Sequence, residues 1–172
     1  AVIANAIASW PSEQGVTMTL TSGSSGLPKA VVHRVEAHLA NASGLLQMMQ
    51  FDAQDRWLLS LPLFHVSGQG VLWRWLLKGA TLVQRDMHPL ADALSGCTHA
   101  SLVPTQLWRL LEHSSDGLAL KQVLLGGAAI PVELTDRAAR QGISCWCGYG
   151  MTEMASTVCA KRANQTSGVG IP

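Results

Sequence analysis

The chain has 172 residues, the size of one domain. Hydrophobic residues make up 48% of it and charged residues 13%, well below the roughly 25% of charged residues in ordinary soluble domains, so the composition excludes an intrinsically disordered chain. The formal net charge is +1, from 12 basic and 11 acidic residues. Because the sequence has no basic cluster, we expect no electrostatically driven binding of nucleic acid.

In chain order, apolar runs rich in β-forming residues alternate with segments of helical period. Two prolines open predicted helices, since the fixed φ of proline suits a first helical turn. The expected elements are a strand at 16–20, a glycine–serine loop at 21–29, a short strand at 30–33, a helix at 36–49, a strand at 57–61, a helix at 70–77, a strand at 81–83, a short helix at 90–94, a strand at 100–103, a helix at 104–112, a strand at 122–125, a helix opened by Pro131, and strands at 143–147 and 156–160.

This alternation predicts an α/β fold with a mainly parallel sheet flanked by helices. We expect residues 1–172 to form a single α/β unit. Ligands of such sheets bind beyond the carboxyl ends of the strands. The candidate binding loops are therefore 21–29, 62–69, 104–106, 126–131 and 148–153.

The sequence also bears on membranes and on the limits of the chain. The longest apolar stretch, 57–77, is interrupted by proline, glycine, histidine and arginine, so it is a poor candidate for a spanning helix. The first basic residue is Lys29, so the N-terminus lacks the charged region of a signal peptide. The chain begins at Ala1 without methionine and stops at Pro172, and we expect it to be a piece of a longer protein.

Four cysteines allow a test for a zinc site. Cys145 and Cys147 form a C-x-C pair, whereas Cys97 and Cys159 are isolated. A zinc site needs a second close pair of ligands, and residues two apart share one face of a strand. We therefore interpret the pair as ordinary strand residues, and free thiols favour a reducing cytoplasm.

The first candidate loop has the composition of an anion site. It reads Thr21-Ser22-Gly23-Ser24-Ser25-Gly26-Leu27-Pro28-Lys29. Small residues let backbone N–H groups close around an anion, hydroxyls add donors, and a lysine supplies charge. A flexible glycine–serine turn is the alternative, but a lysine placed directly behind a strand and a proline favours a phosphate loop. It is not a Walker A loop, because proline and alanine stand at the positions that require Gly and Ser or Thr.

This loop resembles the signature loop of the adenylate-forming superfamily, which includes acyl-CoA synthetases, luciferases and the adenylation domains of peptide synthetases. Three more stretches resemble motifs of that superfamily in the correct order. Residues 61–68 resemble its acyl-pocket motif, 126–128 its adenine-wall loop, and 148–153 the motif that holds adenine, phosphate and metal. Four motifs in order over most of the chain argue against chance.

The resemblance implies an AMP-forming acid–thiol ligase that uses ATP, Mg²⁺ and, as co-substrate, CoA. It implies that Lys29 and the loop wrap the β- and γ-phosphates of ATP, with Thr21, Ser22, Gly23, Ser24, Ser25 and Gly26 as the loop residues. Neutralising pyrophosphate in this way is what attack on an α-phosphate requires.

The same resemblance assigns the later motifs. Gly126, Gly127 and Ala128 would form the adenine wall, and Tyr149, followed by Gly150, would lie against the adenine. Thr152 would contact the α-phosphate and Glu153 would bind Mg²⁺, which makes Lys29, Thr152 and Glu153 the implied catalytic residues. From the residues alone, Glu153 as a solvated surface acid and Tyr149 as a half-buried packing ring stay open.

Arg74 is a charge inside an apolar helical run. A buried arginine normally has an anionic partner. Ser67 lies seven residues earlier and shares one face with Arg74 if the helix begins near Ser67. The alternative is an arginine whose stem packs while its head reaches solvent, and the pattern alone leaves both open.

Residues 65–76, 98–109 and 124–131 resemble the branch of the superfamily that activates o-succinylbenzoate in menaquinone biosynthesis, in its enterobacterial form. This acid has two carboxylates, of which one is activated and the other needs a cationic or polar partner. The resemblance implies that Arg74, with Ser67 and Ser101, recognises the second carboxylate.

Histidines and alternatives complete the sequence-based predictions. His65 is interpreted as a wall of the acyl pocket rather than a base or a loop cap, and four further histidines, His33, His38, His88 and His113, as surface or packing residues. Another aryl- or fatty-acyl-CoA ligase and a non-catalytic nucleotide-binding module stay as alternatives, and a homo-oligomer stays open. The family's ribose-binding acid, hinge and C-terminal lid domain are expected beyond Pro172, so we expect no CoA ligation by these 172 residues alone.

Overall fold

The computed structural model describes residues 15–21, 29–112 and 117–163. In chain order its elements are β1 Val16–Thr21, β2 Lys29–Arg34, α1 Val35–Met49, β3 Arg56–Leu58, α2 Val66–Lys78, β4 Thr81–Val83, α3 Leu90–Ala93, β5 His99–Leu102, α4 Pro104–Glu112, β6 Gln122–Leu125, α5 Val132–Arg140, β7 Ser144–Met151, the 3₁₀ turn η1 Thr152–Met154, and β8 Ser156–Arg162.

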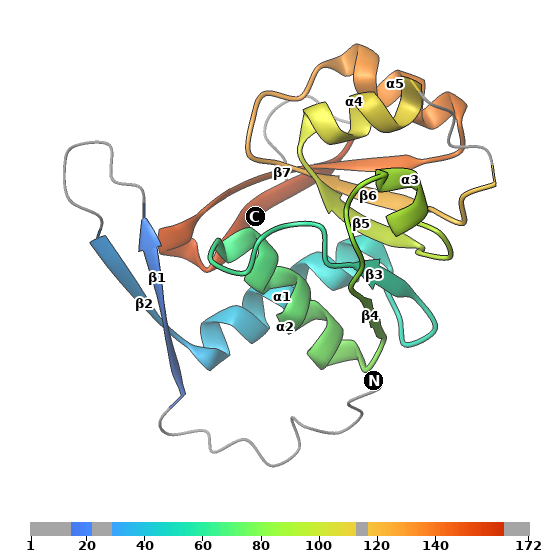
Figure 1. Ribbon diagram of the computed structural model, residues 1–172. Coiled ribbons are helices and arrows are strands. Elements are labelled where there is room, and N and C mark those ends of the chain that lie inside the picture. Colours follow the sequence, from blue (N-terminus) through green and yellow to red (C-terminus); the bar gives the residue numbers. More distant parts are fainter. Residues whose placement is uncertain (1–14, 22–28, 113–116, 164–172) are drawn as a thin grey trace.

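Six of these strands form one sheet with the spatial order β4-β3-β5-β6-β7-β8, and β1 and β2 pair separately as an antiparallel hairpin. The first five strands of the sheet run parallel, and β8 joins its edge antiparallel to β7. Helices α1 and α2 cover one face and α4 and α5 cover the other (Figure 1). The predicted α/β fold with a mainly parallel sheet is confirmed.

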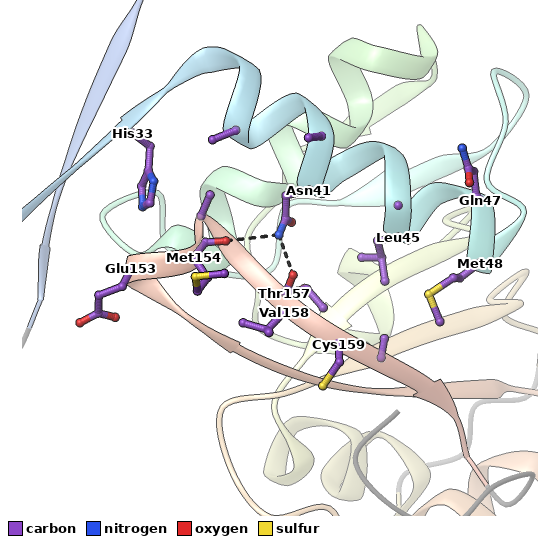
Figure 2. A pocket seen from close by; sticks show the side chains of 15 residues that line it. His33, Asn41, Leu45, Gln47, Met48, Glu153, Met154, Thr157, Val158 and Cys159 are labelled. Atoms are coloured by element: carbon purple, nitrogen blue, oxygen red, sulfur yellow. Dashed lines mark hydrogen bonds between the residues drawn. The ribbon is translucent and has the colours of Figure 1, made fainter. Parts of the chain in front are cut away.

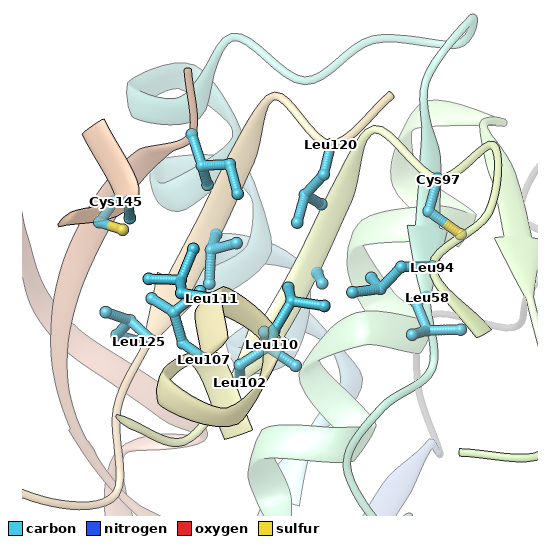
Figure 3. Close-up of a cluster of buried hydrophobic side chains, with 14 of the residues drawn as sticks. Leu58, Leu94, Cys97, Leu102, Leu107, Leu110, Leu111, Leu120, Leu125 and Cys145 are labelled. Carbon is cyan, nitrogen blue, oxygen red and sulfur yellow. The ribbon is translucent and has the colours of Figure 1, made fainter. Parts of the chain in front are cut away.

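The central strands are apolar on both faces, because each face has its own core. Val123 and Leu125 of β6 pack with the leucines of α4 in the cluster that Figure 3 shows. Leu124 between them packs on the opposite face with Phe51 and Trp57. Successive strand residues point to opposite faces, so a strand buried on both sides reads as a continuous apolar run.

The expected loop at 148–153 is wrong in its first part. Strand β7 continues through Gly148 to Met151, because these residues pair with β8. The register shifts between Tyr149 and Gly150, and a Cβ at Gly150 would overlap the carbonyl group of Ser156. A glycine therefore lets the two backbones approach closely at this bulge.

Helix α2 begins at Val66, four residues earlier than the glycine-rich sequence predicts. A Cβ at Gly68 would overlap the carbonyl oxygens of Leu61 and Pro62. The first turn therefore packs directly on the preceding loop, and this tertiary contact outweighs the low helix propensity of glycine. The expected strand at 57–61 is shorter, since β3 ends at Leu58. In the described part of the chain, no helix is long and apolar enough to cross a membrane.

A cluster of titratable side chains lies at the amino ends of the parallel strands, opposite the predicted site, with Asp55 and His99 buried and Lys121 exposed. His99 Nδ1 lies 3.8 Å from Asp55 Oδ1, and Lys121 Nζ lies 3.4 Å from the same oxygen. The His99 ring also makes edge contacts with Phe51, with ring centroids 4.9 Å apart. Burial lowers the pKa of His99 to about 4, against the opposing effect of the Asp55 carboxylate.

We expect His99 to weaken the fold in acid. Between pH 6.5 and 4 the unfolded chain binds a proton that folded His99 does not, so the free energy of unfolding decreases as the pH falls, by on the order of 3 kcal/mol over this window. In urea denaturation at pH 7 and 4.5, His99→Gln should lose less stability than the wild type. His88→Gln, at an exposed position, is the control, and equal losses for His99→Gln and wild type would contradict the assignment.

Candidate functional site

A cavity of about 470 Å³ lies at the carboxyl ends of β3, β5 and β6, beside the last residues of β7. This is the edge at which α/β sheets bind ligands. The cavity is lined by Leu61, Pro62, His65, Val66, Ser67, Arg74, Ser101, Leu102, Val103, Leu124, Leu125, Gly126, Gly127, Gly148, Tyr149, Gly150, Met151, Thr152, Ser156 and Thr157.

Arg74 of α2 is the charged group in the wall of this cavity. Its side chain is buried, with 1% exposure, and its Nε and Nη1 have no hydrogen-bond partner among the described residues. The guanidinium carbon lies 5.2 Å from the centre of the Trp57 ring. Burial lowers the pKa of Arg74 to about 10, so the group is still a cation at neutral pH. The alternative of a solvated head group is excluded.

Small and hydroxylated residues surround the guanidinium. A Cβ at Gly70, one turn earlier on α2, would lie 3.0 Å from Arg74 Nη2 and 3.2 Å from Ser156 Oγ. Ser101 is buried, and its hydroxyl oxygen accepts a hydrogen bond of 3.3 Å from Trp57 Nε1. Ser67 and Arg74 line the same cavity, as their spacing predicts for one face of α2. An anion that entered here would find two unused guanidinium donors and nearby hydroxyls.

Most residues predicted to hold the nucleotide line the same cavity. Gly126, Gly127, Gly150 and Thr152 form part of its wall, and Tyr149 presents a ring that is 57% exposed. Tyr149 therefore has an accessible ring beside the cavity, and its interpretation as a half-buried packing ring stays open. Ala128, the third residue predicted for the adenine wall, is exposed and does not line the cavity.

The predicted phosphate loop connects β1 and β2. Thr21 ends β1, Lys29 begins β2, and the two residues pair across the hairpin. Lys29 is exposed and forms no ion pair among the described residues. Neither residue lines the cavity. The remaining predicted loop residues, Ser22, Gly23, Ser24, Ser25 and Gly26, lie outside the described residues.

Glu153 faces a different space from Arg74. It is exposed on η1 and lines a groove of about 690 Å³ between α1 and β8, together with His33 and Asn41 (Figure 2). No group of three histidine, cysteine or acidic side chains that could hold a metal gathers in the part of the chain that the structure describes. An exposed carboxylate beside Thr152, the predicted contact of the α-phosphate, fits Mg²⁺, which takes one or two protein carboxylates and keeps water and phosphate as its other ligands.

Two histidines that no motif or spacing in the sequence singles out lie beside the η1 turn. His33 Nε2 lies 2.7 Å from the carbonyl oxygen of Thr152. His38 is buried, stacks on Trp73 with ring centroids 5.0 Å apart, and hydrogen bonds to Thr17 Oγ1 at 2.7 Å. The packing interpretation is confirmed for His38, but for His33 it misses the contact with a predicted catalytic residue. The partners are 119 positions apart, so no local pattern reveals this contact.

Known proteins are similar to this chain in sequence. The family described as AMP-binding enzyme matches residues 4–172. A 2-succinylbenzoate–CoA ligase of Salmonella typhimurium is 65% identical over 163 residues, which cover 95% of this chain and 36% of the relative. The chain thus spans about a third of the length of the curated relatives it matches.

Solved structures of proteins with similar sequence share this fold. Wild-type Escherichia coli MenE with a bound m phenylether-linked analogue of OSB-AMS is 64% identical with a TM-score of 0.83, over 90% of this chain and 34% of that one. The o-succinylbenzoate coenzyme A synthetase (MenE) of Bacillus subtilis in complex with ATP and magnesium ion is 30% identical with a TM-score of 0.75, over 85% of this chain and 32% of that one.

Two guanidinium nitrogens of Arg74 have no hydrogen-bond partner among the described residues, so we expect stability and ligand binding to place opposite demands on this side chain. Replacing a buried, incompletely paired charge with an apolar residue of similar length is often neutral or stabilising, by about 1–3 kcal/mol. Arg74→Met should therefore keep or raise the midpoint of thermal unfolding of the ligand-free protein. Arg109→Met, at an exposed position, serves as the control. A loss of several degrees in Arg74→Met alone would show that the protein itself satisfies the guanidinium.

Proposed function

The chain belongs to the family of AMP-binding enzymes, and from this membership we propose that the protein carrying it activates o-succinylbenzoate with ATP and transfers the acyl group to CoA. In the first step the succinyl carboxylate attacks the α-phosphate of ATP, which forms the acyl-adenylate and releases pyrophosphate. In the second step the CoA thiolate attacks the acyl carbon, which forms the thioester and releases AMP.

The buried cation of Arg74 is the observation that carries the choice of substrate. An acid with a single carboxylate uses that group to form the adenylate, and its charge is then no longer available to Arg74. The second carboxylate of o-succinylbenzoate would supply the missing acceptor, and a guanidinium binds a carboxylate through two parallel hydrogen bonds. A monocarboxylic acid would leave the buried donors unpaired, which costs about 1–3 kcal/mol.

The arrangement of the cavity supports two anchoring points for one substrate. Thr152 and Arg74 both line it, so a molecule adenylated beside Thr152 would extend toward the guanidinium. Ser67 and Ser101 would add hydroxyl contacts. His65 is exposed at the residue that precedes α2 and lines the cavity, which supports its interpretation as a pocket wall.

The proposed handling of ATP divides between two segments. Lys29 and the loop before it would neutralise the β- and γ-phosphates as pyrophosphate leaves. Thr152 would contact the α-phosphate. Mg²⁺, held through Glu153, would supply further charge neutralisation on the phosphate oxygens. Lys29 and Glu153 are exposed and form no ion pair within the described part of the chain, which supports these roles.

The curated relatives named 2-succinylbenzoate–CoA ligase extend beyond the region that this chain matches. We propose that the groups needed for the ribose and for the thioester step, including the hinge, the lid domain and its lysine, belong to those further regions. A location in the cytoplasm is also a proposal, and it agrees with the four free cysteines.

The substrate proposal predicts a selective loss in Arg74→Leu. ATP–pyrophosphate exchange is measured on the full-length protein with o-succinylbenzoate, benzoate and a fatty acid. We expect exchange with o-succinylbenzoate alone, and a 10- to 100-fold loss of its kcat/KM in Arg74→Leu, the equivalent of about 1–3 kcal/mol. Arg109→Leu is the matched control. Exchange with the other acids would leave the family assignment intact and overturn the substrate assignment. No exchange with any acid would overturn the proposal that the protein is an acid–CoA ligase.

The metal proposal predicts a different selective change in Glu153→Gln. This variant keeps the size of the side chain but loses its charge, so the Mg²⁺ concentration for half-maximal exchange should rise at least tenfold while the KM of the acid stays within twofold. Glu36→Gln, at an exposed position in the first turn of α1, is the control. An unchanged Mg²⁺ requirement in Glu153→Gln would remove Glu153 from the metal site.

A further inference from the structure

The turn that carries Thr152 and Glu153 has an unusual backbone. After η1 the chain passes through Ala155 with φ of 59° and Ser156 with φ of 132°, and neither residue is a glycine. Residues other than glycine rarely adopt these backbone conformations. Each costs of order 1–3 kcal/mol and persists only when the surrounding structure holds it. The turn therefore depends on contacts from other parts of the fold.

Two side chains supply such contacts. His33 Nε2 lies 2.7 Å from the carbonyl oxygen of Thr152, at the start of the turn. Asn41 Nδ2 donates to the carbonyl oxygen of Thr157 at 2.6 Å and to that of Met154 at 3.4 Å (Figure 2). Carbonyl oxygens on both sides of the two strained residues are thus held from β2 and α1.

Both side chains belong to the segment that follows the predicted phosphate loop. His33 lies on β2, the strand that Lys29 begins, and Asn41 lies on α1, which follows β2 directly. The hairpin is itself anchored by the buried His38, through its hydrogen bond to Thr17 and its stacking on Trp73 of α2. A displacement of the hairpin would therefore pull on the carbonyl of Thr152.

We propose that His33 and Asn41 are positioning residues that hold the Thr152–Glu153 turn in register with the phosphate-loop hairpin. The inference rests on the proposed function, in which the two segments grip different phosphates of one ATP molecule. Small misplacements of such groups cost large factors in rate, up to about 100-fold for 1 Å. The contact sets the distance between the two halves of the nucleotide site, whereas Arg74, the proposed partner of the acid, is carried by α2 and not by this turn.

The chemistry of the His33 contact limits which substitutions preserve it. A carbonyl oxygen only accepts, so His33 Nε2 must carry a hydrogen, as it does in one neutral tautomer and in the imidazolium ion. A glutamine at this position keeps an N–H donor at the end of a side chain of similar length. A leucine keeps much of the volume and has no donor.

The test compares His33→Leu and His33→Gln with His88→Leu, a control at an exposed position, in the full-length protein. We expect His33→Leu to raise the KM of MgATP at least tenfold while the KM of o-succinylbenzoate stays within twofold. His33→Gln should return the KM of MgATP to within threefold of the wild type. Equal changes in both KM values, or no difference between the leucine and glutamine variants, would overturn the proposal.

Two further measurements keep the proposal decidable. If His33→Leu does not fold, Asn41→Asp takes its place, because an ionised carboxylate of the same size cannot donate to the two carbonyls and should produce the same loss for MgATP alone. If the wild type exchanges pyrophosphate with no acid, the proposed function fails, and the Kd of MgATP from calorimetry decides the inference. A Kd within twofold of the wild type in both variants would overturn it, and a tenfold weaker Kd would support it.

Discussion

Arg74 is a cation that the protein buries without an anion of its own among the described residues. The surroundings support it only partly, through the Trp57 ring on one side and the space left by Gly70 on the other. Desolvation disfavours its charge, and this lowers the pKa of Arg74 to about 10. Such an arrangement lowers the stability of the ligand-free protein, and it is consistent with a site completed by a bound carboxylate.

The parallel sheet explains why this site can exist where it does. Its central strands are buried on both faces, so the two cores leave no room for a ligand within the layers. Only the ends of the central strands are left uncovered by the two cores. At the carboxyl ends, β3 leads to α2, β5 leads to α4, and β6 leads to the glycine pair Gly126–Gly127. Arg74 of helix α2 lies beside Trp57 of β3 and lines the cavity at the carboxyl ends of the strands.

The sequence was sufficient for the parts of the site that local chemistry marks. Motif residues such as Ser67, Gly126 and Thr152 do line one cavity, because each follows a strand whose apolar run is recognisable. The extension of β7 to Met151 was not predictable, since it depends on pairing with β8 at a bulge that a glycine permits. The contact of His33 with Thr152 was equally hidden, because it joins segments 119 positions apart. Local propensity has no information on such contacts.

The turn from Thr152 to Thr157 is the wall between two spaces with different charge requirements. Thr152, Ser156 and Thr157 line the cavity that holds the guanidinium, whereas Glu153 lines the groove on the side of α1. A metal held at Glu153 would therefore be separated from Arg74 by one backbone turn. In the proposed function, this separation would keep the cation that selects the acid apart from the cation that neutralises the phosphates. Because the same strained turn bounds both spaces, whatever fixes its backbone also fixes how the two spaces lie relative to each other, and with them the proposed acid and nucleotide positions.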